Sequence, residues 1–112
     1  MKKILILAAF VHTIFCTGQY TAIPDANFEN YLEQNGMGDG VPNNSLVLTA
    51  NIENVTELIV FSKGIQDLTG IEDFAAVELI NCANNNLPIL DVSQNMNLWG
   101  LNCASSNITE LL

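Results

Sequence analysis

The sequence predicts an α/β solenoid of stacked short repeats, with a short parallel β-sheet on its concave face and a helical cap at its N-terminal end. The stretches VELINCANNNLPIL (77–90) and LWGLNCASSNITEL (98–111) repeat one pattern 21 residues apart. Apolar residues in each copy alternate as in a strand, and a short helical pattern precedes the first copy. A fixed period in the low twenties is typical of solenoid proteins.

The two stretches align without a gap. Residues that lie 21 positions apart are Val77 and Leu98, Ile80 and Leu101, Asn81 and Asn102, Cys82 and Cys103, Ala83 and Ala104, Leu87 and Ile108, and Leu90 and Leu111. An earlier copy lies 22 residues upstream and contains Val55, Leu58, Val60, Ile65 and Leu68. We therefore divide the repeat region, 55–112, into copies at 55–76, 77–97 and 98–112, of which the last is incomplete.

The spacing inside a copy predicts a short strand followed by a bend. Ile80 and Cys82 face inward and Asn81 outward, because successive side chains of a strand alternate between its two faces. Asn85 follows at the bend, where an inward amide can satisfy backbone groups that lack a strand partner. The far side of each coil is expected to be closed by a second apolar set: Leu68, Ile71 and Phe74 in the first copy, and Leu90, Val92 and Met96 in the second.

These patterns resemble the leucine-rich repeat family. The motifs are Leu58-x-Val60, Ile80-x-Cys82-x-x-Asn85-x-Leu87 and Leu101-x-Cys103-x-x-Ser106-x-Ile108. LNC (101–103) and LDVSQN (90–95) are similar to exported repeat proteins of Bacteroidetes-type bacteria, and GIQDLTGIEDF (64–74) to internalin-like repeats. The resemblance covers about 55–112 and, more loosely, 23–54. Lys63 and Ser106 replace the expected Asn, so weaker bonding at the bend is expected in the first and third copies.

Residues 19–54 are predicted to cap the open apolar edge of the first repeat. A helix is expected at about 25–35, since Pro24 and Asp25 suit a helix start and Gly36 an end. Its apolar face would carry Phe28, Tyr31 and Leu32.

The stretch NGMGDGVPNNSL (35–46) partly matches a calcium loop. Asn35, Asp39 and Gly40 stand at its first, fifth and sixth positions. Met37 and Leu46 occupy positions that need oxygen ligands, so we favour a turn rich in Gly and Asn and predict no metal site.

Residues 1–18 are predicted to be a secretory signal peptide. Lys2 and Lys3 precede an apolar run at 4–15, and the small residues after it suit cleavage behind Gly18. The run is too short to span a membrane, which takes about 20 residues. A lipoprotein signal at Cys16 and an uncleaved anchor are the alternatives; Phe15 directly before the cysteine disfavours the former.

Cleavage would leave an acidic chain in which Lys63 is the one base against 12 acidic residues, a formal charge of −11. Such a chain is repelled by nucleic acid and anionic lipid, so neither a nucleic-acid partner nor membrane insertion after cleavage is expected. The one histidine, His12, would be lost, and the carboxylates are scattered, so no enzyme and no cofactor are predicted. The expected location is secreted or on the cell surface.

Cleavage would also leave two cysteines, Cys82 and Cys103, at inward positions on neighbouring strands. Buried free thiols are favoured, because both side chains point the same way. A disulfide remains open, since export and strand spacing permit one, and so does a reactive thiol.

The outward positions of the strands form the candidate binding surface. They are Glu57, Ile59, Phe61, Leu79, Asn81, Ala83, Gly100, Asn102 and Ala104, and Trp99 is expected at the edge of the sheet. The apolar cluster of Ile59, Phe61 and Leu79 is unusual for a face in water. It indicates a contact surface for a protein or glycan, although it could also be covered by the cap.

The alternative is a structural spacer at the N-terminus of a larger exported protein, without its own ligand. The last copy stops inside a coil with no polar cap, which a solenoid needs. The sequence is therefore expected to be the N-terminal part of a longer repeat protein, frayed from about residue 98 onward or paired end to end when alone.

The signal peptide yields the first prediction. The exported protein should begin at Gln19, and the amine of this residue can cyclise. Intact-mass measurement of the exported protein checks this; a retained Met1 or a lipid on Cys16 would contradict it.

Overall fold

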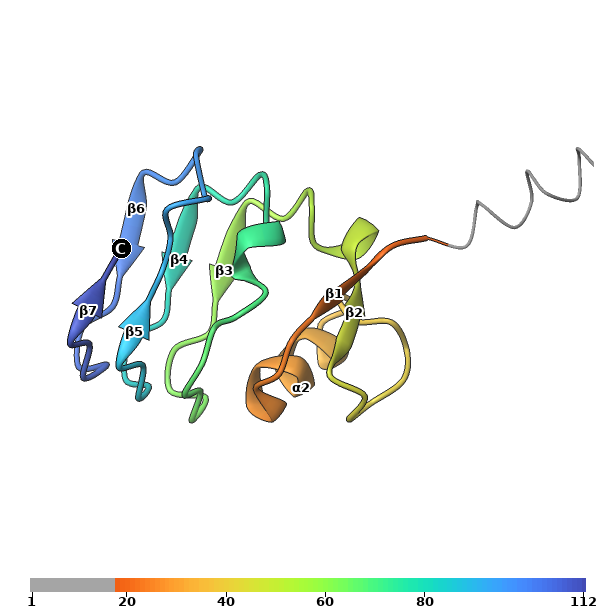
Figure 1. Ribbon diagram of the computed structural model, residues 1–112, viewed down its shortest axis with the longest axis horizontal. Coiled ribbons are helices and arrows are strands. Elements are labelled where there is room, and N and C mark those ends of the chain that lie inside the picture. The colour runs from red at the N-terminus through yellow and green to blue at the C-terminus, as the bar shows by residue number, and fades with distance from the viewer. Residues whose placement is uncertain (1–17) are drawn as a thin grey trace, which may run out of the picture.

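The computed structural model describes residues 18–112, a chain that begins with a small cap and continues as stacked coils (Figure 1). The predicted signal peptide, apart from Gly18, lies outside the described residues. The elements are β1 (Tyr20–Ala22), α2 (Ala26–Gln34), β2 (Leu46–Leu48), the 3-10 turn η2 (Thr49–Asn51), β3 (Glu57–Ile59), the 3-10 turn η3 (Ile71–Asp73), β4 (Leu79–Asn81), β5 (Ile89–Leu90), β6 (Gly100–Asn102) and β7 (Glu110–Leu111). No helix in this part of the chain has the length and apolar character needed to cross a bilayer.

The principal sheet is parallel, in the order β3-β4-β6, and its register follows the repeat. Leu58 pairs with Ile80, and Ile80 pairs with Leu101. Leu58 and Ile80 are fully buried, whereas the residues on either side of each are more exposed, which is the predicted alternation. The 22- and 21-residue steps of the sequence are therefore the steps from one strand to the next.

The sequence predicted one sheet, and the structure has three small ones. β5 and β7 form a second parallel pair on the other side of the coils, with Leu90 level with Leu111. β1 and β2 form an antiparallel pair in the cap, with Thr21 opposite Val47. The strands of both additional sheets have two or three residues and, unlike β3, β4 and β6, do not show a strand alternation that repeats in all three copies.

The far side of the second coil differs from the prediction. Leu90 is buried and Val92 partly so, but Met96 is 84% exposed. Asn95 takes the inward position instead, 21 residues after the buried Phe74. Its Nδ2 donates to the carbonyl oxygens of Ile71 (2.9 Å) and Phe74 (3.4 Å), while its Oδ1 is buried without a partner among the described residues. The inward position expected for Met96 is thus occupied by Asn95, whose amide links two coils.

The bend after each strand depends on Asn85, as predicted. Its Oδ1 accepts from the backbone N–H groups of Lys63 (3.1 Å) and Ile65 (2.9 Å) in the preceding coil. Its Nδ2 donates to the carbonyl oxygens of Val60 and Cys82, both at 2.9 Å. One buried side chain thus ties the first coil to the second.

The next bend has Ser106 in place of the asparagine. Its Oγ donates to the carbonyl oxygen of Cys82 at 2.8 Å, and it makes fewer bonds than Asn85, as expected. The residues Ser62, Asn84 and Ser105, one per coil, all have φ near +55°. The repeat in the sequence therefore encodes a repeated left-handed turn as well as a repeated strand.

The cap is built around α2, which begins one residue after its predicted start and ends one residue early. Asp25 caps the helix by accepting from the N–H of Phe28 at 2.9 Å. Phe28 and Leu32 are fully buried, but Tyr31 is only partly buried, and Glu29 takes the third buried position. Glu29 is tolerated there because its carboxylate accepts from the N–H groups of Asn44 and Ser45, both at 3.0 Å.

The acidic side chains in and beside the loop at 35–46 accept hydrogen bonds from the loop itself. Glu33 accepts from the N–H groups of Asp39 (2.8 Å) and Gly40 (3.0 Å). Asp39 accepts from the Nδ2 of Asn44 and the N–H of Val41, and these bonds lower the pKa of its carboxyl. Asp39 thus binds the loop's own donors, and Asn35 donates from its Nδ2 to the carbonyl oxygen of Tyr31 in α2. The described residues contain no cluster of three or more His, Cys, Asp or Glu able to hold a metal.

The cap seals the first coil by direct contact. Phe28 stacks on Phe74 with ring centroids 6.1 Å apart. The second oxygen of Asp25 accepts from the N–H groups of Gln66 (2.8 Å) and Asp67 (3.2 Å). Gly70 has φ +106°, and a Cβ there would lie 2.3 Å from Cδ1 of Ile23, so only glycine permits this approach. Charge, packing and backbone geometry all fix the cap to the coils.

Burial decreases along the stack. Ile80, Cys82 and Leu87 of the second coil are fully buried, while Leu101, Cys103 and Ile108 at the same positions of the third are partly buried. This is the pattern expected if each coil is covered by the next one.

The two inward cysteines are both free, and only Cys82 is fully buried. Burial raises the pKa of the Cys82 thiol to about 11 from its ordinary value of 9.0, with a smaller contribution from the nearby Cys103. The prediction that both thiols are buried is thus wrong for Cys103, which is only partly buried because the coil that contains it is covered on one side only.

Thiol labelling should distinguish the two cysteines. With iodoacetamide at pH 8, Cys103 should react first and Cys82 about 100-fold more slowly than in urea-unfolded protein, since its thiolate fraction is lower by that factor. Mass spectrometry of the labelled peptides checks the order. Equal rates at the two sites in the folded protein would contradict the assigned burial.

Asn85→Ala should lower the free energy of unfolding by about 1–3 kcal/mol, because it leaves buried N–H and C=O groups without partners. Asn86→Ala is the matched control: Asn86 is exposed, its side chain accepts only from Asn107, and its loss should change stability by less than about 0.5 kcal/mol. Chemical denaturation of both variants measures the difference, and equal midpoints would contradict the role given to Asn85.

Candidate functional site

The structure places the predicted binding residues on one face of the β3-β4-β6 sheet, here called the strand face. It consists of the outward-directed residues Glu57, Ile59, Phe61, Leu79, Asn81, Ala83, Gly100, Asn102 and Ala104, which lie in three rows across the strands. The buried residues between them hold each row in place.

The first row contains Glu57, Leu79 and Gly100. A Cβ on Gly100 would lie 2.5 Å from Cδ1 of Leu79, so Leu79 extends over the glycine. This close approach leaves the leucine partly exposed as an apolar surface beside the Glu57 carboxylate.

The second row contains Ile59, Asn81 and Asn102. The Oδ1 of Asn81 accepts from the N–H of Ala83 at 3.2 Å, and the Oδ1 of Asn102 accepts from Ala104 in the same way at 3.1 Å. These bonds fix the two amides in one orientation. Their Nδ2 groups donate to nothing in the described part of the chain, so two parallel donors remain for a ligand.

The third row contains Phe61, Ala83 and Ala104. The N–H of Ser62 donates to the carbonyl oxygen of Ala83, which places Phe61 level with that alanine. Phe61 is 48% exposed, whereas Ala83 is buried. The ring therefore stands beside two small side chains, an arrangement that leaves room for a flat or aliphatic group against it.

Trp99 lies immediately before β6, at the edge of the sheet as predicted, and is 76% exposed. Its backbone N–H donates to the carbonyl oxygen of Glu78 at 3.0 Å, and its indole Nε1–H approaches Oε1 of Glu78 at 3.4 Å. The sequence analysis assigned Glu78 no role in the site. Its position 21 residues before Trp99 was the signal that the two are neighbours.

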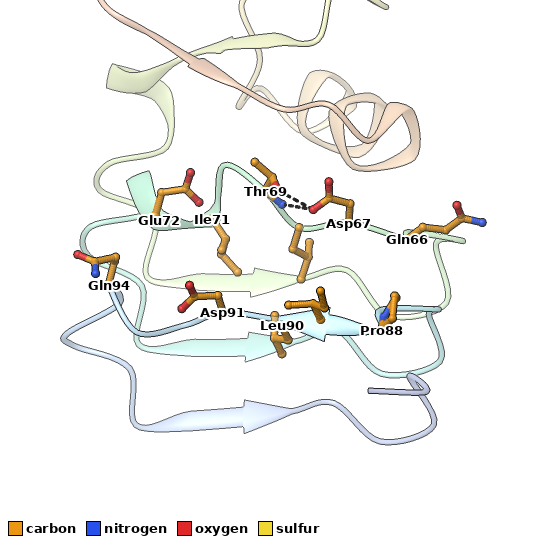
Figure 2. A pocket seen from close by; sticks show the side chains of 11 residues that line it. Gln66, Asp67, Thr69, Ile71, Glu72, Pro88, Leu90, Asp91 and Gln94 are labelled. Carbon is orange, nitrogen blue, oxygen red and sulfur yellow. Dashed lines mark hydrogen bonds between the residues drawn. The ribbon is translucent and has the colours of Figure 1, made fainter. Parts of the chain in front are cut away.

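Sequence reasoning also missed a depression of about 630 Å³ on the opposite side of the coils, between η3 and β5. Figure 2 shows Asp67, Glu72 and Asp91 around it. Asp67 accepts from the N–H and Oγ1 of Thr69, and Asp91 accepts likewise from Ser93, which lowers the pKa of the Asp91 carboxyl. These three carboxylates accept hydrogen bonds that brace turns, so none of them is free for a ligand.

No family model matches the chain, and no curated protein matches it in sequence. Several solved structures are similar in fold, and two of them are described here. The structure of CBM51-2 in complex with GlcNAc and INT domains from Clostridium perfringens ZmpB matches with a TM-score of 0.62 and 22% identity, over 76% of this chain and 17% of that chain. This likeness concerns the fold alone.

The second is the functional domain of InlJ from Listeria monocytogenes, which includes a cysteine ladder; the TM-score is 0.60 and the identity 26%, over 84% of this chain and 24% of that chain. This chain thus spans about a quarter or less of the length of either neighbour. Cys82 and Cys103 here directly follow the neighbouring strands β4 and β6, at equivalent positions of their coils. In its coarse architecture, the described part of the chain is similar to an internalin-like protein of the leucine-rich repeat type.

Proposed function

We propose that the chain is a leucine-rich repeat module of a secreted or cell-surface protein, and that it binds a protein or glycan through the strand face. The observation that carries the proposal is the composition of this face. It combines the partly exposed apolar side chains of Ile59, Phe61 and Leu79 with the free amide donors of Asn81 and Asn102.

The exposed side chains of the strand face contribute little to the core. Leu58, Val60 and Ile80 fill the interior beneath the sheet and are fully buried. Phe61 projects from the opposite face and remains half-exposed, so it gains only part of the hydrophobic stabilisation that burial gives. Apolar groups of this kind in water are better explained by a contact surface than by folding.

The proposal of export follows from the N-terminal sequence and agrees with the bacterial surface or secreted proteins to which the neighbours belong. A binding role rather than catalysis is proposed for the described residues, because histidine is missing from residues 18–112 and most carboxylates there are bonded to the chain. The alternative is a spacer without a ligand. In that case, variants of the strand face should change no binding.

The variant Phe61→Ser/Leu79→Ser should abolish retention of a surface-protein or polysaccharide ligand by the immobilised chain, while changing the thermal midpoint little. Ile89→Ser is the matched control: Ile89 is 56% exposed but lies on the opposite side, in β5, and its loss should leave retention unchanged. Retention is measured by surface plasmon resonance against purified fractions. Equal retention by both variants, or no ligand for any form, would favour the spacer.

A further inference from the structure

The acidic side chains divide into two groups by what they contact. Of the 12 carboxylates, most accept hydrogen bonds that brace the fold. These are Asp25, Glu29, Glu33, Asp39, Asp67, Glu72, Asp73 and Asp91. Glu53, Glu57 and Glu110 accept none within the described chain, and Glu78 accepts only from the indole of Trp99. The second group is therefore free to contact a partner.

Two of these free carboxylates lie at the same end of the strand face. Glu57 begins β3 and is exposed in the row of Leu79, and Glu78 directly precedes β4. Trp99 lies beside Glu78 with its nitrogen 3.4 Å from the carboxylate oxygen, and most of its ring is open to solvent. Two carboxylates, an aromatic ring and the apolar side chain of Leu79 thus lie at the end of the sheet where β3, β4 and β6 begin.

No basic side chain in residues 18–112 can compensate this charge on the strand face. Lys63 is the only base there, and its Nζ lies over the ring of Tyr31 in the cap, 5.5 Å from the ring centroid. The net charge of residues 18–112 is therefore strongly negative, and negative charge at the face favours approach of a cation.

We propose that the strand face binds a basic polypeptide segment, with an arginine or lysine held between Trp99, Glu78 and Glu57 and an apolar residue of the segment against Leu79, Ile59 and Phe61. This rests on the proposed function and names its partner class. A guanidinium can stack on an indole while it donates two hydrogen bonds to a carboxylate, so the three groups suit it together. The Nδ2 groups of Asn81 and Asn102 supply donors for the carbonyl oxygens of an extended chain.

The chemistry of the face favours this partner over a glycan. Anionic glycans are repelled by the same field that attracts the segment. A neutral glycan could stack on Phe61 or Trp99, but it would gain no long-range attraction from Glu57 and Glu78. Only a cationic partner contacts the carboxylates and the indole favourably together with the apolar side chains of Ile59, Phe61 and Leu79.

The test uses a phage-displayed library of random 12-residue peptides selected on the immobilised chain. Selected peptides should be enriched in arginine and lysine and should carry an apolar residue beside them. Glu57→Gln/Glu78→Gln should weaken the Kd of a selected peptide about tenfold, and Trp99→Ala should weaken arginine-containing peptides by a similar factor. Raising the salt from 50 to 300 mM should remove most of the difference in Kd between the wild type and the Glu57→Gln/Glu78→Gln variant, because salt screens exposed charges.

Glu53→Gln/Glu110→Gln is the matched control, because it removes the same charge from two carboxylates that are likewise unbonded but lie off the strand face. It should change the Kd less than twofold. Equal weakening by the two double variants would reduce the effect to net charge and overturn the proposal, as would selection without basic enrichment. A neutral glycan that Phe61→Ser/Leu79→Ser releases and Glu57→Gln/Glu78→Gln retains would overturn the basic partner and leave the proposed function standing.

Discussion

The structure depends on one constraint: a coil of about 21 residues cannot bury its own apolar side chains and must be covered by its neighbours. Ile80 and Cys82, which lie between two other coils, are fully buried, while Leu101 and Cys103 at the same positions of the last coil are not. Asn85, which follows β4, and Asn95, which follows β5, both join the second coil to the first by hydrogen bonds to its backbone. Packing and polar satisfaction therefore repeat with the same period.

The cap answers the same constraint at the other end of the stack. Phe28 covers Phe74, and Asp25 bonds both to its own helix and to the first coil. A carboxylate with three backbone partners is strongly oriented, because charge-assisted hydrogen bonds are shorter and stronger than neutral ones. The cap thus ends the apolar interior without lengthening the sheet, and the rows of the strand face begin at β3.

Much of this architecture could be predicted from spacing alone. The period placed Leu58, Ile80 and Leu101 in register, and strand alternation identified the outward positions, of which Ala83 is buried rather than exposed. That these residues bind a ligand stays a prediction. Hydrophobicity could not show that Asn95 rather than Met96 turns inward, because Asn95 is held there by a hydrogen bond to a carbonyl oxygen of another coil. Nor could it show the buried Glu29, whose partners lie 15 and 16 residues further along the chain.

Hydrogen bonds from backbone N–H groups to carboxylates also explain how so acidic a chain can fold. Unpaired carboxylates repel one another, and a large net charge destabilises a compact state. Here most carboxylates face N–H groups at turns and caps, which act as fixed partial positive charges where Lys63 is the only base in residues 18–112. Glu57 and Glu78 receive no such backbone compensation and lie where the sheet is open. Part of the charge that the fold leaves uncompensated is thus found at the end of the strand face, near Leu79. This surface therefore combines the two properties that a cationic, partly apolar partner would recognise.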